Sequence, residues 1–171
     1  MTTLNRAVVN LLMGGLIILG LSGCNAHSYV SAMTTTPRTH AEPIDTALSR
    51  VSFHIKVPSY FPMSVTSSYA MARPEPAHPK VFRVTLYYLN KYTNEVITEE
   101  VVNLESATAV GVPTKKLSNG LTVTMNNPFD WHWTDQGVTY DLSAAKKSES
   151  GKITAPSFPT EEMEQIVTSM K

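Results

Sequence analysis

The chain has 171 residues, of which 42% are hydrophobic and 16% are charged, so it can bury the core of one ordinary domain and is not disordered by composition. Fourteen Lys and Arg residues balance 14 Asp and Glu residues. This zero formal charge excludes a nucleic-acid binder that relies on a strong basic field. The single cysteine excludes an internal disulfide and a cysteine-rich zinc site.

Residues 1–23 have the organisation of a secretory signal peptide. Arg6 is the only charge, and it is followed by an apolar run from Ala7 to Leu21 that ends in small residues. The run is shorter than the ~20 residues that a transmembrane helix needs. Residues 21–24, Leu-Ser-Gly-Cys, resemble the lipobox of bacterial lipoproteins. In those proteins diacylglycerol alkylates the cysteine thiol, and a peptidase cuts the chain just before it.

The lipobox resemblance implies that Cys24 becomes the lipidated first residue of the mature protein. Acyl chains contribute ~0.8 kcal/mol per buried CH₂, so two or three of them hold a protein firmly at the bilayer. The alternative left open is an uncleaved membrane anchor in which Cys24 is incidental. Both interpretations place the rest of the chain on the outer, extracytoplasmic face of the cell membrane.

The remaining chain divides into a tether and a folded unit. Residues 24–47 hold the lipidated N-terminus and a Ser-, Thr- and Pro-rich stretch without helical or alternating period, which predicts a flexible tether. Residues 48–171 are expected to form one extracytoplasmic α+β domain. Its predicted architecture is an antiparallel β-sheet with one C-terminal amphipathic helix packed on a face.

The first half of this domain is predicted to consist of strands. Apolar and polar residues alternate over 51–57, which predicts a strand that the following prolines end. A second strand is expected at 64–70, and the proline-rich stretch 71–80 is expected to be an exposed loop. The strongest strand pattern is 81–89, which is rich in β-branched and aromatic residues.

A turn over 90–95 is expected to lead into a strand at 96–104 and a short one at 108–112. Asn119-Gly120 predicts a tight turn before a strand at 121–125. A second tight turn at 135–137 then joins the segment around Trp131 and Trp133 to an antiparallel strand at 138–142.

Near the end of the sequence, the spacing of hydrophobic residues changes from that of a strand to that of a helix. A polar loop is expected at 143–155. Hydrophobic residues then recur at i, i+3, i+4 and i+7, which predicts an amphipathic helix with Thr160 as its N-cap. These hydrophobic residues are Met163, Ile166, Val167 and Met170.

Three patches of the domain carry a family resemblance. They are Val-Pro-Ser-Tyr-Phe-Pro at 57–62, Trp-Thr-Asp-Gln-Gly-Val-Thr-Tyr-Asp-Leu at 133–142, and the capped helix at 160–170 with Ser169 near its end. Together they resemble a bacterial extracytoplasmic domain family without a settled function. That family occurs in membrane-anchored lipoproteins and at the outer end of anti-sigma-type regulators, and it is discussed beside carriers that sort outer-membrane lipoproteins. The resemblance implies a fold more than an activity.

Aromatic residues are the best candidates for a binding surface. Trp133 and Tyr140 are expected to face each other across a hairpin as a cross-strand pair. Trp131 shares their face and is expected to be half exposed at the hairpin edge. We therefore predict Trp131, Trp133 and Tyr140 as a binding site, with core packing as the expected role of most other aromatic residues.

Catalytic and metal-binding patterns are weak. A metal site built from His54, His132 and Asp130 is conceivable, but ordinary polar histidines are the favoured interpretation. Glu99 and Glu100 are adjacent, so a strand would point them to opposite faces, which disfavours a carboxylate dyad. No motif for a nucleophile, a catalytic metal or a bound nucleotide is present.

The sequence therefore predicts a membrane-anchored lipoprotein that acts as a non-catalytic binding or sensing module of the cell envelope. Its expected partners are the membrane, through the N-terminal lipid, and an envelope protein, peptide or lipid. Neither a cofactor nor a metal nor a nucleic-acid partner is expected. The alternatives left open are a carrier-like protein for lipids or lipoproteins and an enzyme without a recognisable motif.

Overall fold

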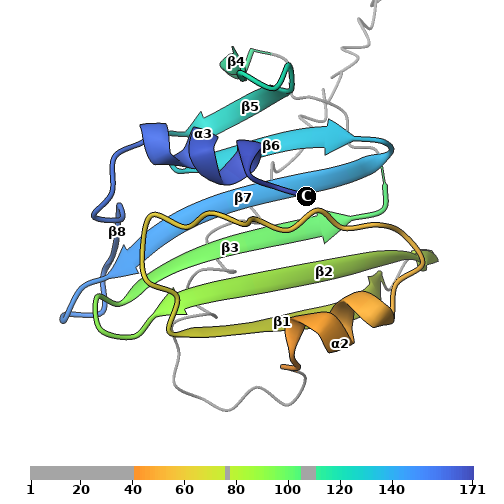
Figure 1. Cartoon of the computed structure of the whole chain (residues 1–171), viewed down its shortest axis with the longest axis horizontal. Coiled ribbons are helices and arrows are strands. Elements are labelled where there is room, and N and C mark those ends of the chain that lie inside the picture. Colours follow the sequence, from red (N-terminus) through yellow and green to blue (C-terminus); the bar gives the residue numbers. More distant parts are fainter. Residues whose placement is uncertain (1–40, 76–77, 105–110) are drawn as a thin grey trace, which may run out of the picture.

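The computed structural model of the protein describes residues 41–75, 78–104 and 111–171. These residues form an open antiparallel sheet of eight strands in the order β1-β2-β3-β7-β6-β5-β4, with β8 paired to β7 (Figure 1). They also form two short helices, α2 (Ile44–Ser49) and α3 (Glu161–Thr168). Cys24 and most of the strand expected at 108–112 lie outside the described residues.

The strands have the following bounds: β1 Ser67–Glu75, β2 His78–Asn90, β3 Glu95–Val102, β4 Thr114–Lys116, β5 Thr122–Asn127, β6 Asp130–Asp135, β7 Val138–Lys147 and β8 Ile153–Thr154.

Several predicted strands are confirmed. The patterns at 81–89 and 96–104 fall in β2 and β3, which pair antiparallel around the expected turn. β6 and β7 form the predicted hairpin, in which Asp135 pairs with Val138. The two residues between them, Gln136 and Gly137, both have positive φ, at 50° and 79°. This is the geometry of a tight hairpin turn that follows the right-handed twist of its strands.

The strand expected at 51–57 is not formed. Residues 51–66 instead cross the sheet as an extended segment without regular secondary structure, which we call the strap. In Figure 1 the strap runs on the same side of the sheet as α3. Alternation over 51–57 does reflect one buried side, since Ile55 is buried and His54 is exposed. That side packs on a sheet face, however, and not beside a neighbouring strand.

Three loop or tether assignments are also wrong. β1 reaches Glu75 and β2 begins at His78, so strands cover most of the expected loop 71–80. Pro74 is tolerated in β1 because β1 is the edge strand of the sheet. β7 extends to Lys147 and β8 follows, inside the expected loop 143–155.

The folded unit also begins before residue 48. Helix α2 starts at Ile44, and its Ala47 is fully buried. Glu42 and Ala70 exchange two backbone hydrogen bonds of 3.0 and 2.8 Å, which anchors the start of this segment beside β1. The predicted tether therefore cannot extend to residue 47.

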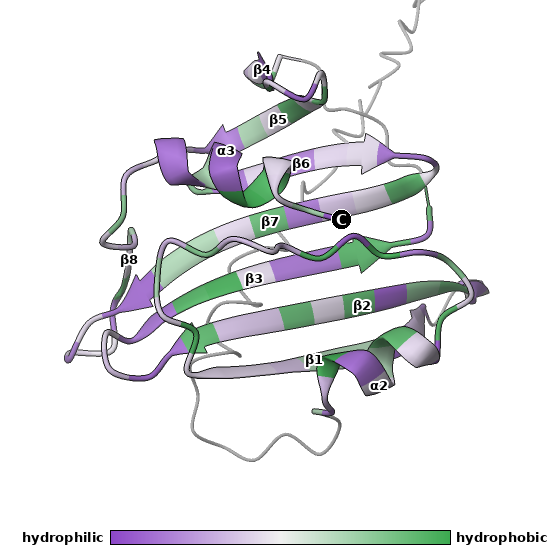
Figure 2. Cartoon of the chain, viewed as in Figure 1, coloured by the Kyte–Doolittle hydropathy of each residue, from purple (hydrophilic) through white to green (hydrophobic). Residues whose placement is uncertain are grey.

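One face of the sheet builds the main core. Cross-strand register places one row of side chains on this face across five strands: Ala70, Leu86, Glu99, Leu142 and Trp131. Figure 2 shows the corresponding changes between hydrophilic and hydrophobic residues along β2 and β3. The strap and α3 contribute Ile55, Met163, Ile166 and Val167 to the same cluster.

The strap is tied to the end of α3 by backbone and side-chain hydrogen bonds. Val57 and Lys171 exchange two backbone bonds of 3.2 and 3.3 Å. The amides of Ser59 and Tyr60 donate to Ser169 Oγ at 3.2 and 3.1 Å, and Ser59 Oγ donates to the Ser169 carbonyl at 2.7 Å. The first and last patches of the family resemblance therefore hold each other in place.

Thr160 occupies the N-cap position of α3 but does not cap it with its side chain. Its backbone is already helical, with φ −60° and ψ −30°. A capping side chain needs an extended backbone at this position to reach the amides of the first turn. The carbonyl of Thr160 instead accepts from the amide of Met163 at 3.0 Å.

Ile166→Ala should destabilise the protein by about 2–4 kcal/mol, because Ile166 is fully buried and its removal leaves a cavity. The exposed neighbour Gln165 provides the control, since Gln165→Ala should stay within about 0.5 kcal/mol of the wild type. Urea denaturation of the three proteins measures both effects. An unchanged midpoint for Ile166→Ala would show that α3 contributes nothing to the core.

Candidate functional site

A cavity of about 340 Å³ opens between the strap, the C-terminal end of α3 and the end of the β6–β7 hairpin. We call it the trough. Its wall exposes more polar than apolar surface, because the aromatic residues and Val167 in it are nearly buried. The trough is lined by Lys56, Asn119, Gly120, Leu121, Trp133, Asp135, Tyr140, Val167 and Met170.

Lys56 and Asp135 form an ion pair in the wall of the trough. Lys56 Nζ lies 2.6 Å from Asp135 Oδ2, and the two side chains are 37% and 27% exposed. Lys56, Asp135 and Tyr140 also line a second, smaller cavity of about 110 Å³. A partly exposed pair of this kind contributes about 0–1 kcal/mol to stability. It can therefore exchange partners at little cost.

Trp133 and Tyr140 form the predicted cross-strand pair. Their ring centroids are 5.2 Å apart, and the ring planes differ by 1°, so the rings are stacked. The Lys56 backbone amide donates to Tyr140 Oη at 3.3 Å. Both aromatic residues line the trough, although each is largely buried. They therefore form a rigid part of the wall and expose only edges to a ligand.

Trp131 does not lie where the sequence predicts. Its side chain is 0% exposed, so the expectation of a half-exposed residue is wrong. Its indole nitrogen donates to the Pro128 carbonyl at 3.0 Å, and Lys115 Nζ lies 5.6 Å from its ring centroid. The hairpin edge is thus closed over Trp131, and the structure brings only Trp133 and Tyr140 of the predicted site to a cavity.

Sequence reasoning missed Lys56 and Asp135. They are 79 positions apart and meet only because the strap crosses the sheet. Asp135 belongs to a recognisable turn, and Lys56 belongs to an alternating segment next to a motif, but neither pattern indicates that the two would pair. Their contact is a consequence of tertiary structure alone.

A larger cavity of about 570 Å³ lies at the other edge of the sheet, between β1 and the residues that flank α2. Ala41, the first described residue, is part of its lining. The described residues therefore do not define its whole wall, and we do not choose it as the candidate site.

Glu99 is a fully buried carboxyl group in the centre of the core face. Its side chain is 0% exposed, and neither oxygen has a hydrogen-bond partner among the described residues. In the sheet its neighbours are Leu86 on β2 and Leu142 on β7. Burial raises the pKa of Glu99 well above its ordinary value, so the group is held in its neutral form.

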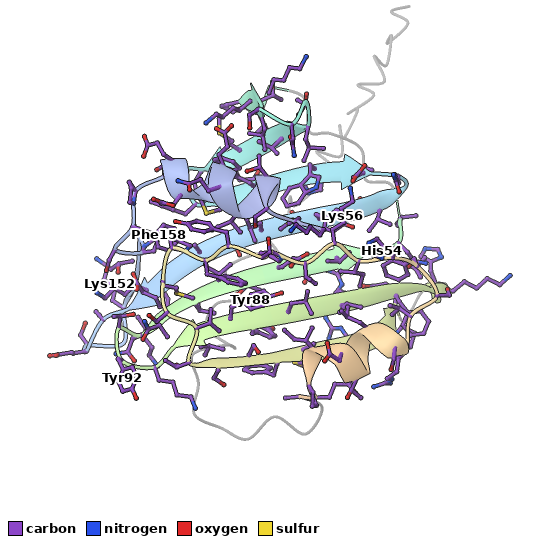
Figure 3. All side chains as sticks on the ribbon, in the orientation of Figure 1. His54, Lys56, Tyr88, Tyr92, Lys152 and Phe158 are labelled. Atoms are coloured by element: carbon purple, nitrogen blue, oxygen red, sulfur yellow. The ribbon has the colours of Figure 1, made fainter. Side chains whose placement is uncertain are left out.

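Tyr88 shares this environment. Its hydroxyl is buried and has no hydrogen-bond partner among the described residues. Burial, together with the nearby Glu99 carboxyl, raises the pKa of Tyr88. Its ring packs on Phe61 of the strap at a centroid distance of 4.5 Å (Figure 3 labels Tyr88). An unsatisfied buried polar group costs about 1–3 kcal/mol, so the core keeps these two groups at the expense of stability.

The opposite face of the sheet carries a small apolar cluster of Tyr87, Val96 and Ala145, and polar and charged groups lie beside it. Cross-strand register places Glu100 opposite Asp141, and Asp141 opposite His132. Arg83 forms an ion pair with Glu100, and His132 Nδ1 lies 2.8 Å from Asp141 Oδ1. Burial raises the pKa of Glu100, and the hydrogen bond to Asp141 raises the pKa of His132. The expectation that Glu99 and Glu100 point to opposite faces is confirmed.

His54 and His132 are not brought together. His54 lies on the strap, which covers the core face, and lines the smaller cavity beside Lys56 (Figure 3). His132 bonds to Asp141 on the opposite face. No group of three or more metal-ligating side chains occurs within the described ranges 41–75, 78–104 and 111–171.

Glu99→Gln should make the protein more stable relative to wild type as the pH rises. Above the ordinary Glu pKa of 4.5, an unfolded wild-type chain loses the Glu99 proton, while the folded chain keeps it because burial raises its pKa. Wild-type stability therefore falls with pH, by up to about 1.4 kcal/mol per unit, until the pH reaches the raised pKa. The glutamine variant lacks this loss.

Urea denaturation at several values between pH 4.5 and about 8 measures the difference between the two proteins. Other titrating groups are common to both and cancel. Glu149→Gln is the matched control, because it makes the same substitution at an exposed position. A difference for Glu99→Gln that does not change with pH would contradict a neutral buried Glu99.

Among the described residues, no helix is both long and apolar enough to cross a membrane. Comparison of the chain with models of protein families, with curated proteins and with solved structures finds no match. The resemblance drawn from the three short motifs therefore stays a prediction.

Proposed function

We propose that the protein is a lipid-anchored, non-catalytic binding module on the outer face of the cell membrane, and that the trough is its binding site. The observation that carries the proposal is the trough itself. Its volume of about 340 Å³ lies in the range of small-molecule sites. Its exposed wall is mainly polar, with Lys56, Asp135 and Asn119 available for hydrogen bonds to a ligand.

Two of the three residues predicted as a binding site line this trough, namely Trp133 and Tyr140. Two of the three patches that carry the family resemblance contribute to its wall, 133–142 through Trp133, Asp135 and Tyr140 and 160–170 through Val167 and Met170. Lys56 directly precedes the first patch. The proposal does not include Trp131, because that residue is closed into the core.

The proposal also treats α3 as an amphipathic cover packed on the core face of the sheet. Its Met163, Ile166 and Val167 are buried in the main core cluster, whereas Glu161 and Gln165 are exposed. In this role the helix closes one side of the trough through Val167.

The membrane part of the proposal rests on the lipobox at 21–24. Cys24 is the only cysteine of the chain, and it stands where a lipobox requires its thiol. A palmitoyl-type anchor at this residue would tether the domain to the cell envelope, where a ligand or partner of the envelope can reach it.

An enzyme is the second candidate, and one observation favours it. Asp141 binds His132 Nδ1, which is how a carboxylate orients a histidine base in hydrolases. This pair alone supplies no nucleophile, however, and the sequence holds no catalytic motif. We therefore prefer the binding function.

Cys24→Ala should abolish lipidation and leave an uncleaved precursor, because no other thiol can form the thioether. Metabolic labelling with palmitate, followed by electrophoresis of the wild type and the variant, measures both effects. Ser31→Ala, a change in the tether, is the control and should label normally. Equal labelling of Cys24→Ala and the wild type would overturn the anchoring proposal.

Ligand binding in the trough should shift the backbone amide resonances of its lining residues. The full chain, isotope-labelled in detergent micelles, is titrated with fractions of an envelope extract. We expect changes at Lys56, Gly120 and Asp135, and none at Tyr92 or Lys152, which lie away from Lys56 in Figure 3. Shifts confined to other residues, or no shifts at all, would contradict a binding function for the trough.

A further inference from the structure

One end of the sheet carries a group of lysines. The β2–β3 turn at 91–94 and the segment 147–152, from the end of β7 to β8, lie side by side there. The Lys147 amide donates to the Asn94 carbonyl at 2.9 Å and joins the two segments. We call this surface the lysine end, and Figure 3 shows its Tyr92 and Lys152 on one side of the molecule. Its lysines are Lys91, Lys147 and Lys152.

Positive charge predominates at the lysine end. In its two segments Glu149 is the one acidic residue against three lysines. Glu95 and Lys146 flank the segments, lie opposite each other in the β3–β7 register and balance each other's charge. Two of the three lysines are exposed, and Lys147 is partly exposed. A surface with this excess of positive charge is complementary to an anionic one.

An open aromatic side chain projects from the same end. Tyr92 is 89% exposed. The turn that carries it is held in place, since the amides of Tyr92 and Thr93 donate to Asn90 Oδ1 at 2.9 and 3.1 Å. The Lys91 amide also donates to Thr66 Oγ1 of the strap at 2.9 Å. Tyrosine rings are enriched at membrane–water interfaces, where they sit at the level of the lipid headgroups.

The lysine end and the trough lie at opposite ends of β7. Asp135 of the trough pairs with Val138, the first residue of β7, and Lys147 is the last. An antiparallel strand of these ten residues is about 34 Å long. A surface that contacts the lysine end therefore leaves the trough free.

The chain before the described residues is long enough for such a contact with the membrane. Sixteen residues, 25–40, separate Cys24 from Ala41, the first described residue. The longest strand, β2, has 13 residues. A chain of 16 residues can span up to about 55 Å, which is more than the length of the sheet along β2. An anchor at Cys24 therefore allows either end of the sheet to reach the bilayer.

We propose that the lysine end docks on the anionic lipid headgroups of the membrane that carries the Cys24 anchor. This inference rests on the anchoring part of the proposed function and adds an orientation to it. The three lysines are drawn to the negative surface, and Tyr92 enters the headgroup layer. Docking holds the trough about 30 Å from the bilayer, on the side where envelope molecules pass.

A polarity-sensitive fluorophore at the lysine end reports docking. The chain, acylated at Cys24, is labelled through Ser150→Cys and placed in vesicles of phosphatidylcholine or of an equal mixture with phosphatidylglycerol. Emission should shift to shorter wavelength only with phosphatidylglycerol. Salt at ~1 M should reverse the shift, because the Debye length falls to about 3 Å. Thr134→Cys, an exposed position near the hairpin end, is the control label and should not shift.

A triple variant tests the assigned residues. Glutamine at Lys91, Lys147 and Lys152 should lower the ratio of docked to undocked protein by about tenfold or more, because each lysine contributes to the attraction. The matched control removes the same total charge from exposed lysines elsewhere and should dock like the wild type. Its substitutions are Lys80→Gln, Lys116→Gln and Lys171→Gln.

The proposal is overturned if the label at Ser150→Cys responds equally in both kinds of vesicle, if it responds in neither, or if the control triple variant also loses the response. Flotation of the same vesicles separates this inference from the anchoring proposal. Protein that floats without an emission shift would remove docking and leave anchoring standing, and protein that does not float would remove both. Lipid-free envelope fractions, which test the trough, should leave the lysine end unchanged.

Discussion

The structure depends on one strap that is held across one face of an open sheet. Strand pairing in the eight-stranded sheet satisfies the backbone but leaves the faces of the sheet exposed. Another segment must therefore pack on the apolar face to remove its side chains from water. Helix α3 is too short to cover that face, and the strap covers a further part of it. The strap forms no strand of the sheet, and its hydrogen bonds to Ser169 and Lys171 tie it to the segment that follows α3. Without these bonds the core would have one open side.

This covering arrangement also explains the trough. The strap meets the segment after α3 at Ser169 and Lys171, and the trough opens beside this contact, at the end of the β6–β7 hairpin. The trough is bordered by side chains that already serve the core, such as Tyr140 and Val167. A cavity that forms in this way has rigid walls, because its lining residues are fixed by packing on their other sides. Preformed walls reduce the entropy that a ligand loses to ordering of the protein.

The sequence predicts the elements with strong local patterns and misses those that depend on distant contacts. The predictable elements have β-branched residues, alternating apolar and polar residues, or turn residues in their own sequence. They are β2, β3 and the β6–β7 hairpin. The alternation over 51–57 correctly indicates one buried side, but alternation cannot distinguish a strand from a strap that packs on a sheet. The Trp133–Tyr140 pair follows from hairpin register, whereas the burial of Trp131 depends on Pro128 and Lys115. Likewise, no local pattern links Lys56 to Asp135.

The bonds between the strap and Ser169 join residues 109 and 110 positions apart. Contacts of such long range close large loops and are slow to form. The strap is among the first parts of the domain to be synthesised, and its anchor is among the last. The core face therefore stays uncovered until the chain has been made as far as Ser169. A chain that stops short of this residue would keep its apolar face open, and such open faces favour aggregation over folding.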